Sequence, residues 1–281
     1  MKHILVPIDF SPCSLAAAKA AIALGEISKA KIYFLHISED AGVGHVPRNR
    51  GPRPLSEEHQ HALAQIRSGL ADLVKQAEQS GLKARQELVL GTAQDWIESY
   101  IKPFHIDMVV MGSQGSGNAR GVRLGSTTLQ FIRHAQVPVL VIKQPIENFN
   151  IRRIVFASDF KRDLIKPFKV VADLSTTCKA HLDLLYVCTP YHFVATKSVV
   201  ASMKRFMHQF KGMVYTPHVY NAVTEERGIH EFARDAAADL IALTTEGRTG
   251  VMRMLKPSIA EGLIKHASLP LLILNTKQKV S

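Results

Sequence analysis

Glycine and hydroxyl side chains crowd one short segment of the chain, from Met111 to Thr127, which reads MGSQGSGNARGVRLGST. Glycine lacks a Cβ atom, so its backbone can approach a ligand closely and can adopt positive φ angles. Successive N–H groups of such a loop can point at an anion, and a helix that starts after it adds unpaired N–H groups and the positive end of its dipole. The chemistry that this segment favours is the binding of phosphate groups.

A carboxylate, Asp9, follows the first apolar run of the chain, Ile4 to Ile8. A carboxylate is suited to accept hydrogen bonds from ribose hydroxyls, but it would repel a phosphate. We therefore expect Asp9 at the sugar end of a nucleotide whose phosphates lie on the glycine-rich segment. Ser11 and Pro12 directly follow, so a role of Asp9 as a helix cap is the alternative interpretation.

Apolar runs and amphipathic stretches alternate along the chain and predict the elements that would position these groups. In the first half the predicted strands are 4–6, 32–37, 88–90, 108–111 and 137–142, and the predicted helices include 15–25, 63–77 and 124–135. Strands separated by helices imply a parallel sheet covered on both faces, and right-handed crossovers give a doubly wound α/β fold. A strand order of 3-2-1-4-5 places Asp9 beside Gly112, where the order reverses and ligands bind.

The sequence repeats itself, which predicts two such units in tandem. Ile4–Phe10 matches Ile154–Phe160 at an offset of 150, and Phe131–Ile142 matches Leu263–Leu274 at an offset of 132. We expect the domains to be 1–146 and 147–281, each with a five-stranded sheet. The last strands are apolar and need covering at the sheet edge, so we expect them to pair with each other.

Composition narrows the class of protein. The chain has 281 residues, a formal net charge of +11 and three cysteines. The length suggests about two domains, and so few cysteines fit a reducing, cytoplasmic location without disulfides. The basic residues are dispersed, without an aromatic-rich nucleic-acid motif, and no apolar run approaches the roughly 20 residues of a membrane span. We expect neither nucleic acid nor a membrane as partner, and no bound structural metal.

The glycine spacing excludes a P-loop and fits a dinucleotide fingerprint poorly. It reads Gly112-x-x-Gly115, then nine residues, then Gly125-Ser126. This pattern resembles the ATP-binding branch of the universal stress protein family, whose signature is G-2x-G-9x-G-S/T. Val6–Asp9 resembles the first strand of that family, and the stretch from His134 to Ile142 resembles its last helix and strand. The resemblance covers the whole chain, as two tandem copies.

The resemblance implies an adenine nucleotide alpha hydrolase-like fold and ATP as the ligand, with or without Mg²⁺. The residues that it implies for the adenine and ribose are Pro7, Asp9 and Ile37, and those for the phosphates are Gly112, Gln114, Gly115, Gly125, Ser126 and Thr127. For Gly112 and Gly125 a plain turn and a plain helix start are the alternatives. Pairing of the last strands makes the dimer in this family, and here we expect it within one chain, with a homodimer of whole chains left open.

The second unit departs from the pattern. Asp159 matches Asp9, but Thr244 and Pro257 stand where Gly112 and Gly125 stand in the first unit. Proline has no N–H to donate, and threonine adds a Cβ atom. We therefore predict that the first unit binds nucleotide and that the second binds it weakly, binds something else or serves as a scaffold.

The residues near the predicted site do not make up a catalytic set. Phosphoryl transfer usually needs a metal-holding acid and a residue that positions the nucleophile, and the sequence assigns neither. Cys13, in the first turn of a predicted helix, is more readily a small buried residue than a reactive thiolate. We expect a regulatory ATP-binding protein of the stress response and no enzyme. The alternatives are a slow ATP hydrolase of related architecture and a partner-binding scaffold with a vestigial pocket.

Overall fold

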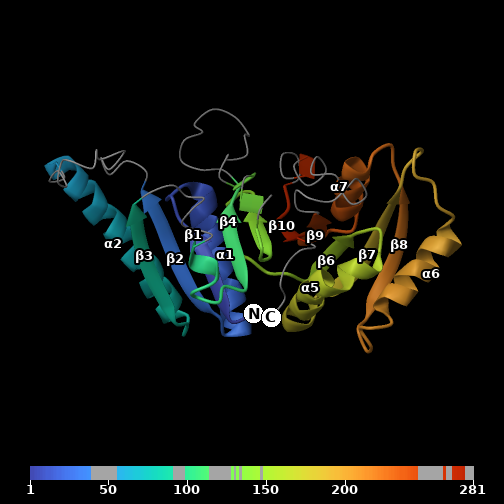
Figure 1. The fold of residues 1–281 in the computed structure, drawn as a ribbon, viewed down its shortest axis with the longest axis horizontal. Coiled ribbons are helices and arrows are strands. Elements are labelled where there is room, and N and C mark those ends of the chain that lie inside the picture. Colours follow the sequence, from blue (N-terminus) through green and yellow to red (C-terminus); the bar gives the residue numbers. More distant parts are fainter. Residues whose placement is uncertain are drawn as a thin grey trace.

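A computed structural model describes residues 1–38, 56–90, 99–113, 128–129, 131–132, 135–145, 148–245, 262–263 and 268–275 of the chain. Within these ranges ten strands form one sheet, in the order β3-β2-β1-β4-β5-β10-β9-β6-β7-β8 (Figure 1). Each half of the sheet has the predicted 3-2-1-4-5 order, so the doubly wound fold and its repetition are confirmed.

The bounds of the strands follow the apolar runs of the sequence. The strands are β1 (His3–Pro7), β2 (Lys31–Ser38), β3 (Ala84–Leu90), β4 (Met108–Gly112), β5 (Val139–Ile142), β6 (Arg153–Ala157), β7 (His181–Cys188), β8 (Tyr215–Asn221), β9 (Leu240–Thr245) and β10 (Leu271–Asn275). β3 starts four residues earlier than predicted. It is an edge strand, where Arg85 and Glu87 can reach water, so its first residues do not form the apolar run by which the other strands were predicted.

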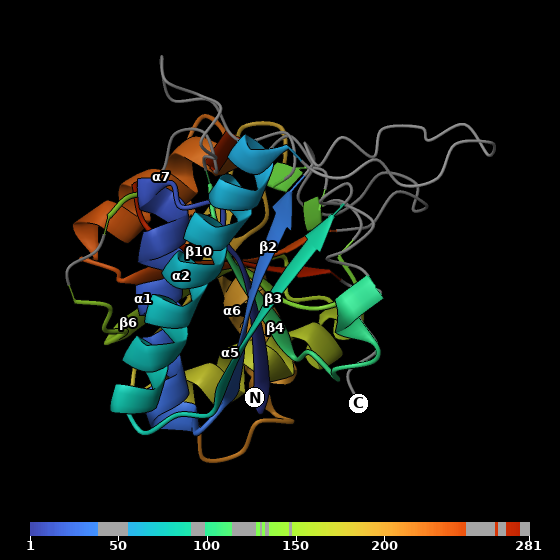
Figure 2. The ribbon, with the colours of Figure 1, turned by 90° about the vertical axis from the view of Figure 1, so that its left-hand side faces the viewer.

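Helices cover both faces of the sheet. Those with described bounds are α1 (Pro12–Ser28), α2 (Glu57–Gln79), α5 (Ile165–Cys178), α6 (Thr196–Met207) and α7 (Glu225–Asp235), with a 3-10 turn, η1 (Arg162–Leu164), before α5. One apolar cluster packs the sheet against α1, α2, α5 and α6, and a second packs its other face against α7 and residues 131–132. Figure 2 shows α1 and α2 side by side on one face.

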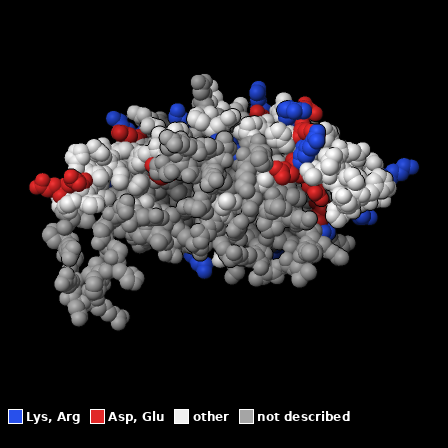
Figure 3. Space-filling model, turned by 90° about the horizontal axis from the view of Figure 1, so that it is seen from above, with Lys and Arg blue, Asp and Glu red and all other residues white. Residues whose placement is uncertain are grey.

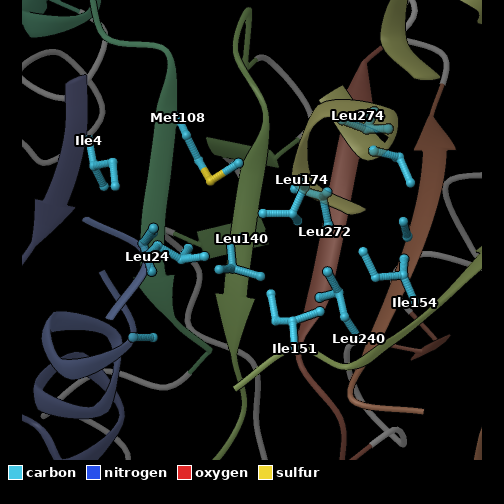
Figure 4. Packing of buried hydrophobic residues seen from close by; sticks show 14 of the residues in the cluster. Ile4, Leu24, Met108, Leu140, Ile151, Ile154, Leu174, Leu240, Leu272 and Leu274 are labelled. Carbon is cyan, nitrogen blue, oxygen red and sulfur yellow. The ribbon is translucent and has the colours of Figure 1, made fainter. Parts of the chain in front are cut away.

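The two halves join through β5 and β10, which pair antiparallel while all other neighbouring strands pair parallel. Leu140 lies opposite Leu272, and both are fully buried. The close-up in Figure 4 shows these leucines within one layer of apolar side chains that runs from Ile4 to Ile154. The predicted pairing of the last strands within one chain is therefore confirmed.

The repetition extends to the backbone conformation and to side-chain contacts. Phe10 and Phe160, which are 150 residues apart, both adopt positive φ angles of 61° and 56°. Asp107 accepts hydrogen bonds from the N–H groups of residues 2 and 3, and Asp239 accepts them from residues 152 and 153. The two halves thus share the same backbone turn after the first strand and the same hydrogen bonds from an aspartate to the start of that strand.

The described surface carries charges of both signs. In the view from above, acidic and basic side chains lie close to one another where the residues are described (Figure 3). No helix in the described part of the chain combines the length and the apolar character that a membrane crossing needs.

Candidate functional site

The crevice predicted from the sequence lies where β1 and β4 run side by side. The register pairs Ile4 with Met108 and Leu5 with Val109, so both strands end at the same edge of the sheet. β1 continues toward α1, whereas β4 is followed by the glycine-rich segment. The strand order reverses between them, and open parallel sheets bind their ligands at this kind of position.

Asp9 lies half-buried just beyond β1, where it organises the start of α1. Its Oδ1 accepts a hydrogen bond from the Ser11 N–H at 3.0 Å, and the Ser11 side chain caps α1 by accepting from the Ser14 N–H at 3.2 Å. The helix cap is therefore Ser11, and Asp9 supports the cap by accepting from its N–H. A carboxylate offers about four acceptor positions, so the bond to Ser11 does not by itself exclude a role toward a ligand.

Pro7 and Ile37 lie beside this carboxylate at the ends of β1 and β2. Pro7 is paired with Leu35, and the Ile8 N–H donates to the Leu35 carbonyl at 2.8 Å, so the pairing continues past the end of β1. Pro7 lies two residues after Leu5, and Ile37 lies two residues after Leu35. Side chains two residues apart in a strand point to the same face, so Pro7 and Ile37 belong to the face of the sheet that carries Leu5 and Leu35. The structure thus brings together three of the predicted residues, Pro7, Asp9 and Ile37.

His36 fixes the turn after β1. Its Nδ1 lies 2.8 Å from the Ile8 carbonyl oxygen, and since a carbonyl only accepts, Nδ1 carries the hydrogen. Burial lowers the pKa of His36, while the bond to Ile8 and the charge of Asp9 act in the opposite direction. The ring also packs against Phe10, with centroids 5.6 Å apart.

Gly112 lacks a Cβ atom for a reason that the sequence did not reveal. A Cβ there would lie 2.8 Å from the backbone C of Cys13 and 2.8 Å from the backbone N of Ser14. The first turn of α1 packs directly against Gly112, in the space that a Cβ atom would need. In the second half Thr244 takes this position, and α5 begins at Ile165, three residues later than the counterpart of Pro12, with the η1 turn before it.

Two hydrogen bonds hold the ends of the glycine-rich segment at the end of β4. The Thr128 hydroxyl donates to the Gly112 carbonyl at 3.0 Å, and the Ser113 N–H donates to the Ile142 carbonyl at 2.9 Å. The segment therefore leaves β4 and returns to it. The other residues that the resemblance implies for the phosphates, Gln114, Gly115, Gly125, Ser126 and Thr127, lie outside the described residues.

Lys143 is a residue of this region that the sequence analysis missed. Its carbonyl accepts from the Cys13 thiol and from the Ser113 hydroxyl, both at 3.5 Å. Burial lowers the pKa of the Lys143 ammonium to about 8, with Cys13 acting weakly in the opposite direction. A comparison of the two units could have pointed to it, because Asn275 stands at the matching position. Cys13 is itself buried, in agreement with its interpretation as a small buried residue.

The second half treats its matching carboxylate differently. Asp159 forms an ion pair with Lys161, which stands where Ser11 stands in the first half. One oxygen of Asp159, Oδ1, is buried without a hydrogen-bond partner. An ammonium group thus neutralises the carboxylate that, in the first half, caps a backbone N–H.

Two further features lie away from the crevice. A cavity of about 430 Å³ opens between the two halves at the opposite, amino ends of β4 and β5, with Leu24, Pro138 and Leu174 in its lining. No group of three or more His, Cys, Asp or Glu side chains in the described ranges is arranged to hold a metal ion.

Relatives of known family match about half of the chain. A universal stress protein of Methanocaldococcus jannaschii is 30% identical over 148 residues, which are 51% of this chain and 83% of the relative. A second one of the same archaeon is 25% identical over 154 residues, which are 51% of this chain and 95% of the relative. Both relatives thus correspond to about one half of this protein.

The whole arrangement of two halves also occurs in a solved structure. The universal stress protein from Archaeoglobus fulgidus superposes with a TM-score of 0.76 and 17% identity, over 98% of each chain, and so has the same fold. The sequence model of the universal stress protein family matches residues 1–143 and again residues 150–275. With this double match over nearly its whole length, the chain belongs to the universal stress protein family, as a tandem two-domain member.

Proposed function

We propose that this protein is a cytoplasmic regulator of the stress response that binds ATP in its first domain, 1–146. The second domain, 147–281, holds the pseudo-dimer together and has lost the phosphate site. The observation that carries the proposal is the position of Asp9: its half-buried carboxylate lies beside the end of β4, where both ends of the glycine-rich segment are tied down.

Each group has a role in this proposal. Pro7 and Ile37 offer an apolar surface to the adenine, and Asp9 accepts hydrogen bonds from the ribose hydroxyls. The backbone N–H groups of Gly115 and Gly125 bind the phosphates, since a helix that starts after a glycine loop favours an anion. The remaining phosphate contacts are assigned to Gly112, Gln114, Ser126 and Thr127.

The second domain supports the assignment by contrast. Lys161 neutralises Asp159, so the ribose would have to compete with an ion pair for that carboxylate. Thr244 is buried where the first domain has Gly112, and Pro257 replaces the glycine that would begin the phosphate-binding helix. One nucleotide per chain is the expected stoichiometry.

The proposed output is the difference between the ATP-bound and the empty protein. Phosphoryl transfer needs an acid that holds Mg²⁺ and a group that positions the nucleophile, and the proposal assigns neither role to a residue of this site. Any hydrolysis of ATP would therefore be slow and incidental. Mg²⁺ would bind through the phosphates of ATP itself.

The first experiment identifies what the protein carries. The chain is purified without added nucleotide, unfolded, and the released small molecules are identified by mass spectrometry. We expect ATP or ADP from the wild type and none from Gly115→Val, whose circular dichroism should be unchanged. If the wild type carries no nucleotide and binds no added ATP, the proposal fails and the scaffold alternative takes its place. Steady ATP turnover that disappears in Asp9→Ala would instead favour a hydrolase.

A further inference from the structure

We propose that Lys143 provides a cationic contact for the terminal phosphates of the bound nucleotide and so makes the site selective for di- and triphosphates over AMP and adenosine. This inference rests on the proposed ATP site in the first domain and adds to it a residue that lies outside the glycine-rich segment. It concerns the described part of the chain, immediately after β5.

Lys143 lies at the end of the third of three neighbouring strands. β1, β4 and β5 are adjacent in the sheet, and they end near Asp9, Gly112 and Lys143 respectively. Neighbouring strands are about 4.8 Å apart, so Lys143 follows a strand about 10 Å away from the strand of Asp9. A nucleotide whose ribose is held at Asp9 and whose phosphates cross the end of β4 extends toward Lys143.

Hydrogen bonds fix the backbone of Lys143 against the start of the glycine-rich segment. Its carbonyl accepts from the Ser113 hydroxyl at 3.5 Å, and the preceding carbonyl, of Ile142, accepts from the Ser113 N–H at 2.9 Å. The Cys13 thiol, in the first turn of α1, donates to the same Lys143 carbonyl. The lysine is therefore anchored at the point where the predicted phosphate loop begins.

The alternation of β5 gives the face to which the lysine belongs. Val139 and Val141 pack in the cluster that contains Phe131 and Ile132, whereas Leu140 and Ile142 pack on the other face. Because side chains alternate between the two faces along a strand, Lys143 belongs to the same face as Val139 and Val141. That face carries the helical residues after the glycine-rich segment, whose start would contribute N–H groups to the phosphates.

The electrostatic setting of Lys143 favours an anionic ligand. The ammonium is half-buried, and its desolvation lowers its pKa to about 8. Within the described ranges, no ion pair joins it to a carboxylate. At pH 7 a group with this pKa is still about nine-tenths protonated. A desolvated cation in a crevice is destabilising by itself, and a perturbed group of this kind is typical of ligand sites.

The second domain provides an internal comparison. At the offset of 132, Lys143 corresponds to Asn275, which is buried and uncharged. The same domain has Thr244 and Pro257 in place of two glycines of the pattern. The cation is thus present in the domain that has the phosphate pattern and absent from the domain that has lost it.

The test compares affinities for ATP, ADP, AMP and adenosine in the intact chain by isothermal titration. We expect Lys143→Gln to weaken ATP and ADP binding about tenfold or more, as expected for the loss of a charge-assisted contact, and to change AMP and adenosine binding less than about twofold. Lys143→Arg should retain most of the ATP affinity. The control, Lys211→Gln, removes the same charge from an exposed position in the second domain and should change nothing.

The pH dependence gives a second readout. Between pH 7.5 and 9.5 the phosphates stay ionised, because their second pKa is near 6, while Lys143 loses its proton. ATP affinity of the wild type should therefore fall over this range, more steeply than that of Lys143→Gln. Unchanged ATP affinity in Lys143→Gln, or an equal loss for adenosine, would overturn the inference. A wild type that binds none of the four ligands would instead overturn the proposed function, and the inference with it.

Discussion

The Thr128 hydroxyl donates a hydrogen bond to the Gly112 carbonyl oxygen across 3.0 Å, and this contact joins the two ends of the glycine-rich segment. Thr128 is buried, with 4% of its surface exposed. The bond therefore ties the helical residues after the segment to the last residue of β4. In the proposed site it sets the distance between the first phosphate-binding glycine and the start of the helix.

Thr128→Val should weaken ATP binding. Valine has nearly the shape of threonine, but it leaves the Gly112 carbonyl without this donor, which should also destabilise the fold by about 1 kcal/mol. ATP affinity measured by titration and unfolding measured in urea test the two effects separately. Thr128→Ser, which keeps the hydroxyl, should bind ATP nearly as well as the wild type. Equal ATP affinity in the valine and serine variants would contradict the role of the bond.

Gly112→Ala should destabilise the protein in the absence of any ligand. The added Cβ would lie 2.8 Å from backbone atoms of Cys13 and Ser14, which cannot move without shifting α1, and overpacking of this kind costs about 1–3 kcal/mol. The matched control is Gly262→Ala, whose Cβ meets the flexible end of the Glu226 side chain. Urea unfolding should show a clear loss for residue 112 and little for residue 262. Equal losses would mean that the approach of α1 is not the constraint.

The lowered pKa of His36 makes stability depend on pH. The folded protein binds a proton at this ring only below the ordinary pKa of 6.5, whereas the unfolded chain binds it already near that value. The unfolded state therefore holds more protons as the pH falls through 6.5, so the free energy of unfolding decreases toward acid. His36→Gln, which can still donate to Ile8, should show a weaker decrease between pH 7.5 and 5.5. Parallel curves for the two proteins would contradict this account.

Asp183 is a buried carboxylate with three basic neighbours in the second domain. Its side chain is 3% exposed, and its Oδ1 lies 2.9 Å from Nε2 of His218 and 3.3 Å from Nε2 of His181. The Nε of Arg153 lies 3.7 Å from Oδ2. The group connects β6, β7 and β8, and Tyr33 holds the matching position in the first domain.

Asp183→Ala should destabilise the protein by about 1–3 kcal/mol, because it leaves the partly exposed donors of His181, His218 and Arg153 without their acceptor. Asp235→Ala is the control, since Asp235 pairs with Arg234 at the surface and such pairs contribute about 1 kcal/mol or less. Chemical denaturation of both variants measures the difference. A loss for Asp183→Ala no larger than that of the control would show that the buried cluster is not stabilising.

Much of the fold could be predicted from the sequence, because burial leaves a pattern in neighbouring residues. The apolar runs gave the strands, and the repetition gave the second copy of the sheet. The pairing of β5 with β10 followed from apolar edges that need covering, such as Leu140 and Leu272. The start of β3 was predicted too late because this edge strand begins with exposed polar residues such as Arg85, which interrupt the apolar pattern.

The site was harder to predict because it depends on contacts between residues far apart in the sequence. Asp9 was placed correctly at a strand end, since the strand order determines its neighbours. Gly112 was predicted to contact phosphate or to form a plain turn, and the structure adds a constraint that the sequence did not reveal, the close approach of α1. Lys143 was missed because the hydrogen bonds of its carbonyl with Cys13 and Ser113 form only where the ends of β4 and β5 meet the start of α1.

The most direct test of the account is an isothermal titration of the intact chain with ATP, carried out on the wild type, Asp9→Asn and Asp159→Asn. Asparagine at residue 9 keeps an oxygen for the Ser11 N–H but loses the charged acceptor for the ribose. The account predicts one ATP per chain, a large loss of affinity in Asp9→Asn and no change in Asp159→Asn. Two ATP per chain, no binding at all, or a loss confined to Asp159→Asn would contradict it.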